Sequence, residues 1–557
     1  MRKPGSIQGI GDRWMAVVLV SVLTLLFLFL VGEQDRLPAL ASSAPETETM
    51  VSSPPPPPDV VDEAHRFEFA RENILGTSLD LLVIGDDPEQ AKGVEARILE
   101  EIEKREILIS TYRTDSEISL INARPFAASE QIEVSYSLWL LLEECRHVGR
   151  QSGGAFNAFA GNAVKLWRQA AKTGVQPAKP DLAAAAASSR AGFEISSRRN
   201  GRWVRRLAPG SFDFDGIGKG YVIDKAVREA VEAFPKIRGL RLNIGGEIKV
   251  WGQADYAENR PWRIGIANPE RPADNAAPIA EIEVRNLAVA TSGDYARSLR
   301  IAGASVNHIL DPRTARPVDH VRSATVVAST AQRADALATA LCVMAPEDGL
   351  TMIEAMSDAA CLIIDASGRQ YRSAAFATLE ASPKPATKGA WPVGRSVSIQ
   401  FELVRSENVA PFHRHYVGAW VENESGRRVR ILALWAKPAD LRYVQDLDEF
   451  WRDAWLFAGE GTDTGKMLGV SRATRPPGEY KLLWDGLDDS GQAVPQGGYT
   501  IHLDVNREKG PPDRRERHTH VMMKLNCGAE PDTARAEDRP ELRNVQAVYT
   551  STRGGDE

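Results

Sequence analysis

The chain has 557 residues, which is long enough for about three domains of ordinary size. Hydrophobic residues make up 43% and charged residues 26%, as in a globular protein, and the formal net charge of -7 comes with scattered Lys and Arg rather than a basic stripe. We therefore expect no nucleic-acid partner. The four cysteines lie far apart and form no Cys-x-x-Cys pair, which gives no support to a zinc site or a thioredoxin-like motif.

The N-terminus predicts export. Residues 1–14 are basic and should stay in the cytoplasm, and residues 15–31 form an uncharged apolar run that acidic Glu33 and Asp35 follow. This charge distribution inserts the run with its N-terminus inside. The run is either an uncleaved signal anchor or a signal peptide, for which residues 39–41 offer a small-residue cleavage site. Because that site lies well beyond the run, we favour an anchor in the membrane.

A linker and a first set of elements follow. Residues 32–66 are rich in Pro, Ala and Ser, and such a segment favours a stiff, extended spacer. Residues 77–84 read as a strand, residues 88–112 as a long amphipathic helix, and residues 137–148 as a second helix. Order should therefore begin near residue 67.

Residues 212–221 form a glycine-rich stretch that could hold an anion, a cation or both. Phe212, Phe214 and Ile217 are spaced as in a short strand, so the two aspartates between them should share the opposite face. Three glycines and a lysine follow, and a helix is expected over residues 221–234. The spacing matches neither a Walker loop nor a dinucleotide-binding fingerprint. A plain glycine turn is the alternative interpretation.

The remaining elements predict an α+β domain over residues 67–382. Strands are expected at residues 287–290 and 324–328, and a compact helix at residues 335–344. Strands and helices do not alternate strictly, which argues against a doubly wound sheet. A Pro- and Lys-containing linker follows at residues 383–395.

The last third predicts a β-sandwich-like accessory domain over residues 396–525. Its strands tend to alternate apolar and polar residues, with turn signals between them. Such strands are expected at 397–403, 415–421, 429–435, 480–484 and 499–505. Residues 526–557 are charged and contain proline, so we expect a disordered tail.

Two segments could carry chemistry. Asp335 and Thr339 lie four apart in the predicted helix, so their oxygens can reach one ion, and oxygen ligands suit magnesium or calcium. The alternative is a helix-starting Asp and a packed Thr. His308 can accept a proton near neutral pH, with Asp311 beside it to orient the ring or raise its pKa. A structural histidine is the alternative there.

These segments, taken in order, resemble the ApbE-like FAD:protein FMN transferase family over about residues 67 to 380. The resemblance rests on several motifs in one order: residues 110–119 with Asn122, then 154–157, 213–224, 243–247, 290–295, 308–312 and 334–341. The C-terminal third resembles a small uncharacterised domain that bacteria encode beside periplasmic flavin or redox proteins. We expect it to be an accessory binding module, because its histidines, His413, His415, His518 and His520, lack a supporting ligand pattern; metal binding by His518 and His520 is the alternative that stays open.

The resemblance implies transfer of FMN from FAD, the substrate, to a Thr or Ser hydroxyl of an exported acceptor protein, with Mg2+ as cofactor and AMP as product. Together with the export predicted from the N-terminus, we expect a location on the periplasmic side of the bacterial inner membrane, anchored by residues 15–31 or released if that segment is cleaved. The resemblance assigns the metal to the Gly216 carbonyl, Asp335 and Thr339, and proton abstraction to His308 with Asp311. The implied FAD-binding residues are Tyr112, Ala155, Phe156, Asn157, Asp213, Lys219, Ser292 and Gly293.

Two departures from the family pattern concern the binding geometry. Asn157 stands where the family usually has Asp, and Ala315 stands where it often has Gly. Two alternatives stay open. One is a magnesium-dependent FAD pyrophosphatase, which would use the same site with water as acceptor. The other, which these two changes suggest, is a non-catalytic flavin-binding protein.

Overall fold

The computed structural model describes most of the chain beyond residue 65. The described residues are 66–198, 201–254, 259–270, 275–276, 278–293, 298–381, 391, 395–404, 415–436, 447, 449–450, 471–472, 475, 477–489, 492–507 and 518–551. The predicted apolar segment 15–31 lies outside them. Within these residues, no helix is both long enough and apolar enough to cross a membrane.

An eight-stranded antiparallel sheet organises the larger part of the described chain. Its strand order is β1 (Arg66–Ile74), β2 (Thr77–Ile84), β6 (Gly239–Ile244), β7 (Glu247–Gly252), β10 (Ala288–Gly293), β15 (Val321–Ala328), β16 (Ala359–Asp365) and β17 (Gln370–Arg372). Both faces of β15 are buried except at Arg322, so its sequence does not alternate between apolar and polar residues.

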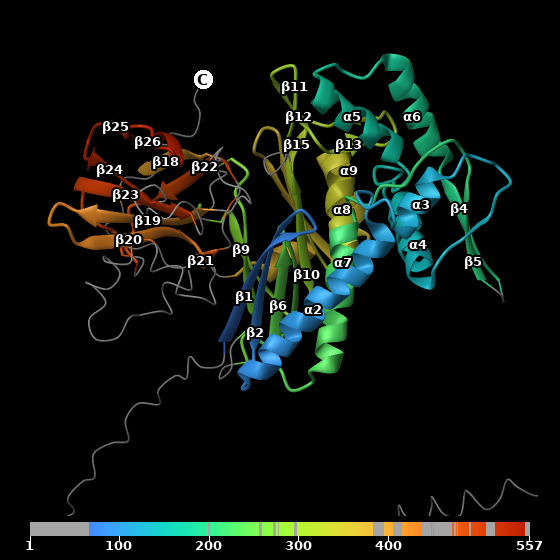
Figure 1. The fold of residues 1–557 in the computed structure, drawn as a ribbon, viewed down its shortest axis with the longest axis horizontal. Helices are drawn as coiled ribbons and strands as arrows, with labels where there is room; N and C mark the ends of the chain where they lie inside the picture. Colours follow the sequence, from blue (N-terminus) through green and yellow to red (C-terminus); the bar gives the residue numbers. More distant parts are fainter. Residues whose placement is uncertain are drawn as a thin grey trace, which may run out of the picture. The chain divides into compact units, whose positions relative to one another are not determined.

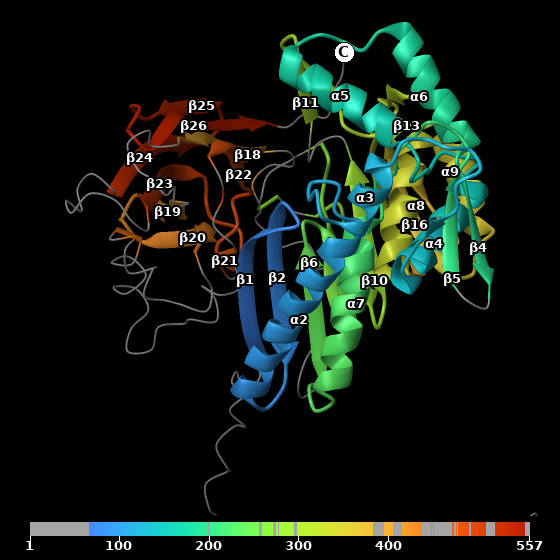
Figure 2. The same cartoon turned by 45° about the vertical axis from the view of Figure 1, so that its right-hand side comes forward.

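Helices cover one face of this sheet. In Figures 1 and 2, α2 (Pro88–Ile109), α7 (Gly218–Ala233) and α8 (Ala331–Val343) lie along it, and their buried side chains join those of the strands in the main core. The opposite face packs in a separate core against the hairpin of β8 (Trp262–Ile266) and β9 (Ala280–Val284) and against α10 (Ala374–Leu379). These layers confirm the predicted α+β class.

Shorter elements complete this part of the chain. They are α3 (Glu117–Ala123), β3 (Ile132–Glu133), α4 (Tyr136–Gln151), α5 (Gly161–Thr173), α6 (Lys179–Ala191), β4 (Phe193–Arg198), β5 (Gly201–Arg206), β11 (Ser298–Ile301), β12 (Ala304–Asn307), β13 (Leu310–Asp311), β14 (Arg316–Pro317) and α9 (Pro346–Glu354). The predicted helices at 88–112, 137–148 and 335–344 are thus present with shifted ends.

The C-terminal strands form a two-sheet sandwich with its own core, as predicted. One sheet has the order β22 (Gly478–Trp484), β18 (Arg395–Leu403), β26 (Leu542–Ser551) and β25 (Asp532–Arg535). The other has β21 (Ser471–Arg472), β20 (Arg428–Trp435), β19 (His415–Asn423), β23 (Gly497–Arg507) and β24 (His518–Cys527). Side chains of both sheets, including Trp435 and Trp484, fill the space between them together with Trp391, which precedes β18.

The expectation of a disordered tail from residue 526 is wrong for its described part. Strand β26 lies between β18 and β25 and pairs with both. Leu542, Val545, Ala547 and Tyr549 are buried in the sandwich core. In the described part of this segment, both prolines precede β26 and the one charged residue of β26, Arg543, is exposed, so the composition of the segment hid the apolar positions of the strand.

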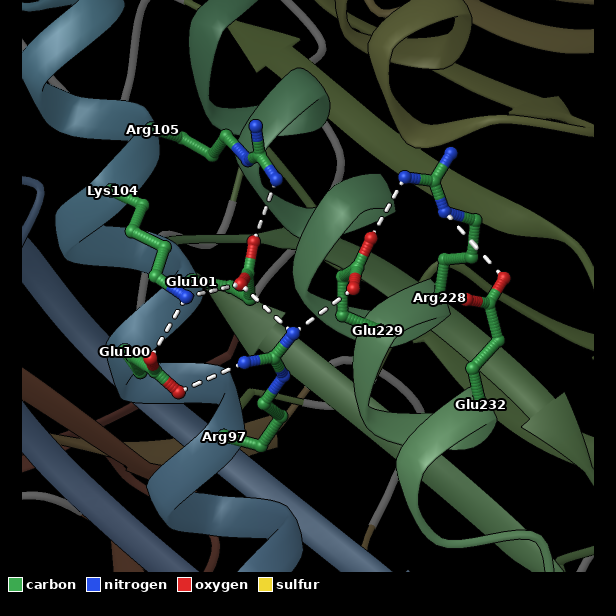
Figure 3. Close-up of polar contacts among 8 residues, drawn as sticks. All are labelled: Arg97, Glu100, Glu101, Lys104, Arg105, Arg228, Glu229 and Glu232. Carbon is green, nitrogen blue, oxygen red and sulfur yellow. Dashed lines mark hydrogen bonds and ion pairs between the residues drawn. The ribbon is translucent and has the colours of Figure 1, made fainter.

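A network of ion pairs joins α2 to α7 (Figure 3). Glu101 is 2% exposed and lies 2.7 Å from Arg105, 3.0 Å from Lys104 and 3.2 Å from Arg97. Arg97 also reaches Glu229 of α7 at 3.0 Å. A buried carboxylate is costly without cations, so three cations of α2 stabilise Glu101, and Arg97 links this cluster to α7.

Glu101→Gln should lower the free energy of unfolding by roughly 2–3 kcal/mol, because three cations lose the carboxylate that they share. This loss is smaller than for a fully buried ion pair, since the three cations stay partly exposed. Urea unfolding followed by circular dichroism measures this. Glu232→Gln is the control, because Glu232 is 65% exposed and 3.8 Å from Arg228, and its change should stay within about 0.5 kcal/mol. Equal effects of the two substitutions would contradict the role of Glu101.

Candidate active site

A cavity of about 180 Å³ gathers most of the residues that the sequence predicts for the site. Its walls come from the loop before α5, the start of α7, the turn between β6 and β7, the end of β10, the residues around β13, and α8. Eleven predicted residues line it: Ala155, Phe156, Asn157, Asp213, Gly216, Lys219, Ser292, Gly293, His308, Asp335 and Thr339. Segments far apart in the sequence therefore converge on one hollow.

Tyr112 lines a neighbouring cavity of about 440 Å³. Asp215 and Lys219 line both cavities, so the two hollows adjoin at the start of α7. Asp311 is the remaining predicted residue, and it stands between two residues that line the smaller cavity without lining it itself.

The segment before α7 is an irregular loop rather than the predicted strand. The Asn122 side chain accepts a hydrogen bond from Phe212 N at 2.8 Å and donates one to Phe212 O at 2.9 Å. Asp213 N donates to Ala158 O at 2.8 Å. The alternation was predicted correctly, because Phe212 and Phe214 are buried on one side, but these bonds replace the ladder of a strand.

Two glycines of this stretch permit close approach. A Cβ on Gly216 would lie 3.1 Å from Thr339 Oγ1. The absence of a side chain at Gly216 therefore lets its backbone lie close to Thr339, another residue of the predicted metal set. A Cβ on Gly220 would lie 2.3 Å from the Ala331 carbonyl oxygen, so α7 can meet the start of α8 only with glycine at that position.

The two helices cap each other with carboxylates. Asp335 of α8 accepts a hydrogen bond from Gly220 N in the first turn of α7 at 3.1 Å. Asp224 of α7 accepts from Ala331 N and Gln332 N at the start of α8, both at 2.9 Å. The unpaired N–H groups and positive end of each helix favour a negative partner. Burial nevertheless raises the pKa of both carboxyl groups above their ordinary value.

Glu247 is a site residue that the sequence reasoning did not include. Its Oε1 forms an ion pair with Lys219 Nζ, and its Oε2 is buried without a hydrogen-bond partner. Burial, opposed by Lys219 and reinforced by Asp335, raises the pKa of Glu247 to about 7. The Gly245-Gly246-Glu247 turn was the available signal, since such a turn lets the backbone approach a ligand.

Arg168 of α5 is a second residue that sequence reasoning missed. Its guanidinium lies 2.6 Å from Asp215, 3.5 Å from Asp213 and 4.9 Å from the centre of the Tyr112 ring, whose hydroxyl it also contacts at 2.9 Å. Burial and then Asp215 raise the pKa of Asp213 to about 6, and Arg168 opposes them. The two neighbouring aspartates indicate that a cation lies nearby, but the sequence does not indicate which residue supplies it.

His308 follows β12 in a loop that Asn307 fixes. The Asn307 side chain donates to Val318 O at 2.8 Å and accepts from Ile309 N at 3.0 Å. The Asp311 carboxylate accepts from Arg313 through both of its oxygens, at 2.9 and 3.1 Å, and its role in orienting His308 stays a prediction. Asp311 thus shapes the turn beside His308, where its backbone oxygen accepts from Ala315 N at 2.7 Å.

The residues of the predicted metal set supply oxygen only. A backbone carbonyl, a carboxylate and a hydroxyl suit a hard cation such as Mg2+, and the unpartnered buried oxygen of Glu247 in the same cavity adds negative character. In the described part of the chain, no cluster of three or more His, Cys, Asp and Glu residues could hold a metal ion. The predicted set contains a single carboxylate, so it is not a cluster of that kind.

Both departures from the family pattern have local causes. Asn157 donates to Ser189 O at 2.7 Å and accepts from Phe159 N at 2.8 Å, a pair of bonds that only an amide can make. Ala315 has a φ of 58° and accepts from Trp167 Nε1 at 2.8 Å. Glycine adopts that backbone conformation without strain, but the Ala315 methyl is fully buried in a small apolar cluster.

Comparison with known proteins gives the family. The model of the ApbE family matches residues 75–363, and the chain belongs to this family. A second model, described as a predicted periplasmic protein (DUF2271), matches residues 396–542. That match extends past residue 525, in keeping with the ordered strands found there.

Individual relatives agree with this assignment. An FAD:protein FMN transferase of Vibrio cholerae serotype O1 is 32% identical over 286 residues, which are 50% of this chain and 81% of the relative. That of Treponema pallidum is 31% identical over 326 residues, 55% of this chain and 87% of the relative. The crystal structure of an ApbE protein from Thermotoga maritima has a TM-score of 0.50 and 27% identity, and covers 57% of this chain and 100% of its own.

Asn157→Asp should lower the free energy of unfolding by about 1–3 kcal/mol, because a carboxylate cannot donate a hydrogen bond to Ser189 O. A carboxylate oxygen would instead face the Ser189 carbonyl oxygen, and two acceptors repel each other. Thermal or urea unfolding measures the change. Asn286→Asp is the matched control, since Asn286 is exposed and its side chain only accepts, from Gly252 N at 2.8 Å. An Asn157→Asp protein as stable as the control would show that the amide donor is dispensable.

Proposed function

We propose that this protein is an FAD:protein FMN transferase that acts on an exported acceptor protein. Membership of the ApbE family and relatives that carry this name support the reaction class. The observation that carries the proposal for this chain is the shared cavity, in which the metal-binding candidates, a lysine and a histidine face one hollow next to a second one. Two adjoining hollows suit a dinucleotide with two distinct halves.

The proposed chemistry is a displacement at the phosphorus of the FMN half of FAD. A Thr or Ser oxygen of the acceptor forms a new bond to this phosphorus, the pyrophosphate bond breaks, and AMP leaves. His308 accepts the hydroxyl proton, because a hydroxyl is a weak nucleophile until it is deprotonated. Lys219 lines both hollows and offers its positive charge to the phosphates.

The Gly216 carbonyl, Asp335 and Thr339 are proposed to hold Mg2+. When bound, the ion supplies neutralisation of the charge that develops on the phosphate oxygens. The N-terminal caps described above hold Asp335 in position for this role, because the same side chain contacts the start of α7 and lines the cavity. Glu247 positions Lys219 through their ion pair.

An exported location is proposed for the whole catalytic part. The match of residues 396–542 to a predicted periplasmic protein supports export, and so does the order of basic, apolar and acidic residues at the N-terminus. We further propose that residues 15–31 anchor the protein at the periplasmic side of the inner membrane. Immunoblotting of washed membranes tests the anchor. Recovery of all the protein in the soluble fraction would contradict this proposal.

Incubation of the full-length protein with FAD, Mg2+ and a Thr-containing acceptor polypeptide tests the reaction. We expect flavin on the acceptor and one AMP for each flavin transferred, with loss of both when the metal is chelated. Mass spectrometry of the acceptor and chromatography of the nucleotides measure them. Free FMN with AMP would instead identify a pyrophosphatase, and FAD that stays intact would identify a flavin-binding protein.

Asp335→Asn should lower Mg2+-dependent transfer by about 10²-fold or more, because it removes the negative charge from the metal set but keeps an oxygen to accept from Gly220 N. Asp348→Asn is the control, since Asp348 is an exposed aspartate in the first turn of α9 and does not line the cavity. Its transfer rate should stay within about fivefold of the unaltered protein. A fully active Asp335→Asn protein would refute the metal assignment.

A further inference from the structure

The outer face of the larger sandwich sheet carries a row of stacked rings. His502 of β23 and His520 of β24 lie with their ring planes at 15° to each other, and Trp420 of β19 stacks on both, with ring centres 4.5 and 5.6 Å away. His502 is only 6% exposed and Trp420 is 2% exposed. A row of buried polar side chains on the outer side of a sheet is unusual, because burying apolar side chains there would carry a smaller desolvation cost.

The two histidines face each other through ring nitrogens. His502 Nδ1 and His520 Nε2 are 3.1 Å apart. Bonds from imidazole nitrogen to a first-row transition metal are about 2.0–2.1 Å long, so two nitrogens at this separation can bind one ion with little movement. In the absence of an ion the same pair shares one hydrogen.

A carboxylate lies behind the first histidine. Glu422 Oε2 is 3.3 Å from His502 Nε2, within ion-pair range but outside hydrogen-bond geometry, and Glu422 Oε1 accepts from Trp420 Nε1 at 2.9 Å. A carboxylate near the far nitrogen favours a hydrogen on that nitrogen through its negative charge, which leaves the lone pair on Nδ1 available to a metal ion. The contact of Trp420 fixes this carboxylate in turn.

A thioether stands next to the pair. Met522 is the cross-strand partner of His502 and lies two residues beyond His520, on the same face of β24. Directly opposite residues of an antiparallel pair have Cβ atoms about 4.5–5.5 Å apart, and the Met522 side chain is 57% exposed and free to swing. Thioether sulfur with imidazole nitrogen is a donor set that favours copper(I) over zinc or magnesium.

We propose that His502, His520 and Met522 form a copper(I)-binding site on the outer face of the sandwich. Copper(I) accepts such a three-donor set, whereas zinc usually takes four. When the ion binds to His520 Nε2, the ring hydrogen moves from Nε2 to Nδ1. The imidazole ring therefore stays neutral. The site is separate from the flavin cavity in chemistry and in the residues that form it.

Titration of the full-length protein with copper(I) under anaerobic conditions, in competition with bicinchoninate, tests the proposal. We expect one equivalent to bind and to quench tryptophan fluorescence, because Trp420 stacks on a ligand.

His520→Gln should abolish this binding, and Met522→Leu should weaken it about tenfold or more. Glu422→Gln, behind the site, should weaken it about 10–100-fold. Trp420→Phe should keep the binding and lose most of the quenching.

His147→Gln is the control, since His147 is an exposed histidine of α4 and its loss should leave copper binding unchanged. Circular dichroism and FMN transfer should be unchanged in the His520→Gln protein, which separates this proposal from that for the flavin cavity. Less than half an equivalent of bound copper(I), or wild-type affinity in both the His520→Gln and Met522→Leu proteins, would overturn the proposal. Zinc binding that exceeds copper(I) binding would overturn the choice of metal.

Discussion

The exchange of carboxylates between α7 and α8 is the constraint on which the candidate active site depends. Each helix starts with N–H groups that have no partner within the helix, and each receives an aspartate from the other. Glycine at position 220 allows the approach, because any side chain there would meet the start of α8. Gly216 and Thr339 come together as a consequence. The metal-binding candidates therefore exist as a set only when the two helices are packed.

Buried charge has opposite roles in the two parts of the large domain. Between α2 and α7, Glu101 has three cations around it and contributes to helix packing (Figure 3). In the cavity, two buried carboxyl groups and one lysine form a less complete arrangement, and the pKa of Glu247 is raised to about 7 as a result. Buried carboxyl groups with such shifts cluster at functional sites, where a missing cation is supplied by a ligand.

The sandwich shows how one sheet can present two different faces. The inner residues of β23 and β24 alternate into an apolar core with the facing sheet. Their outer residues form a polar row with aromatic rings, in which His518 pairs with Asp504 at 2.5 Å and Asp504 accepts from Phe450 N at 2.8 Å. His502 Nδ1, His518 Nε2 and the Asp504 carboxylate each have a specific hydrogen-bond partner. The outer face is therefore an ordered surface rather than a generic solvated one.

The sequence by itself determined the class of fold, the helices and most of the sandwich strands, because apolar periodicity records which face of an element is buried. Its motif order also identified eleven of the residues that line the cavity. It failed where a role depends on a neighbour distant in the chain: Arg168 beside Asp213, and Glu247 beside Lys219. It also failed at β26, whose order comes from pairing with β18. Only the tertiary structure decides such partners, since an ion pair or a strand pairing depends on distance in space and not on spacing along the chain.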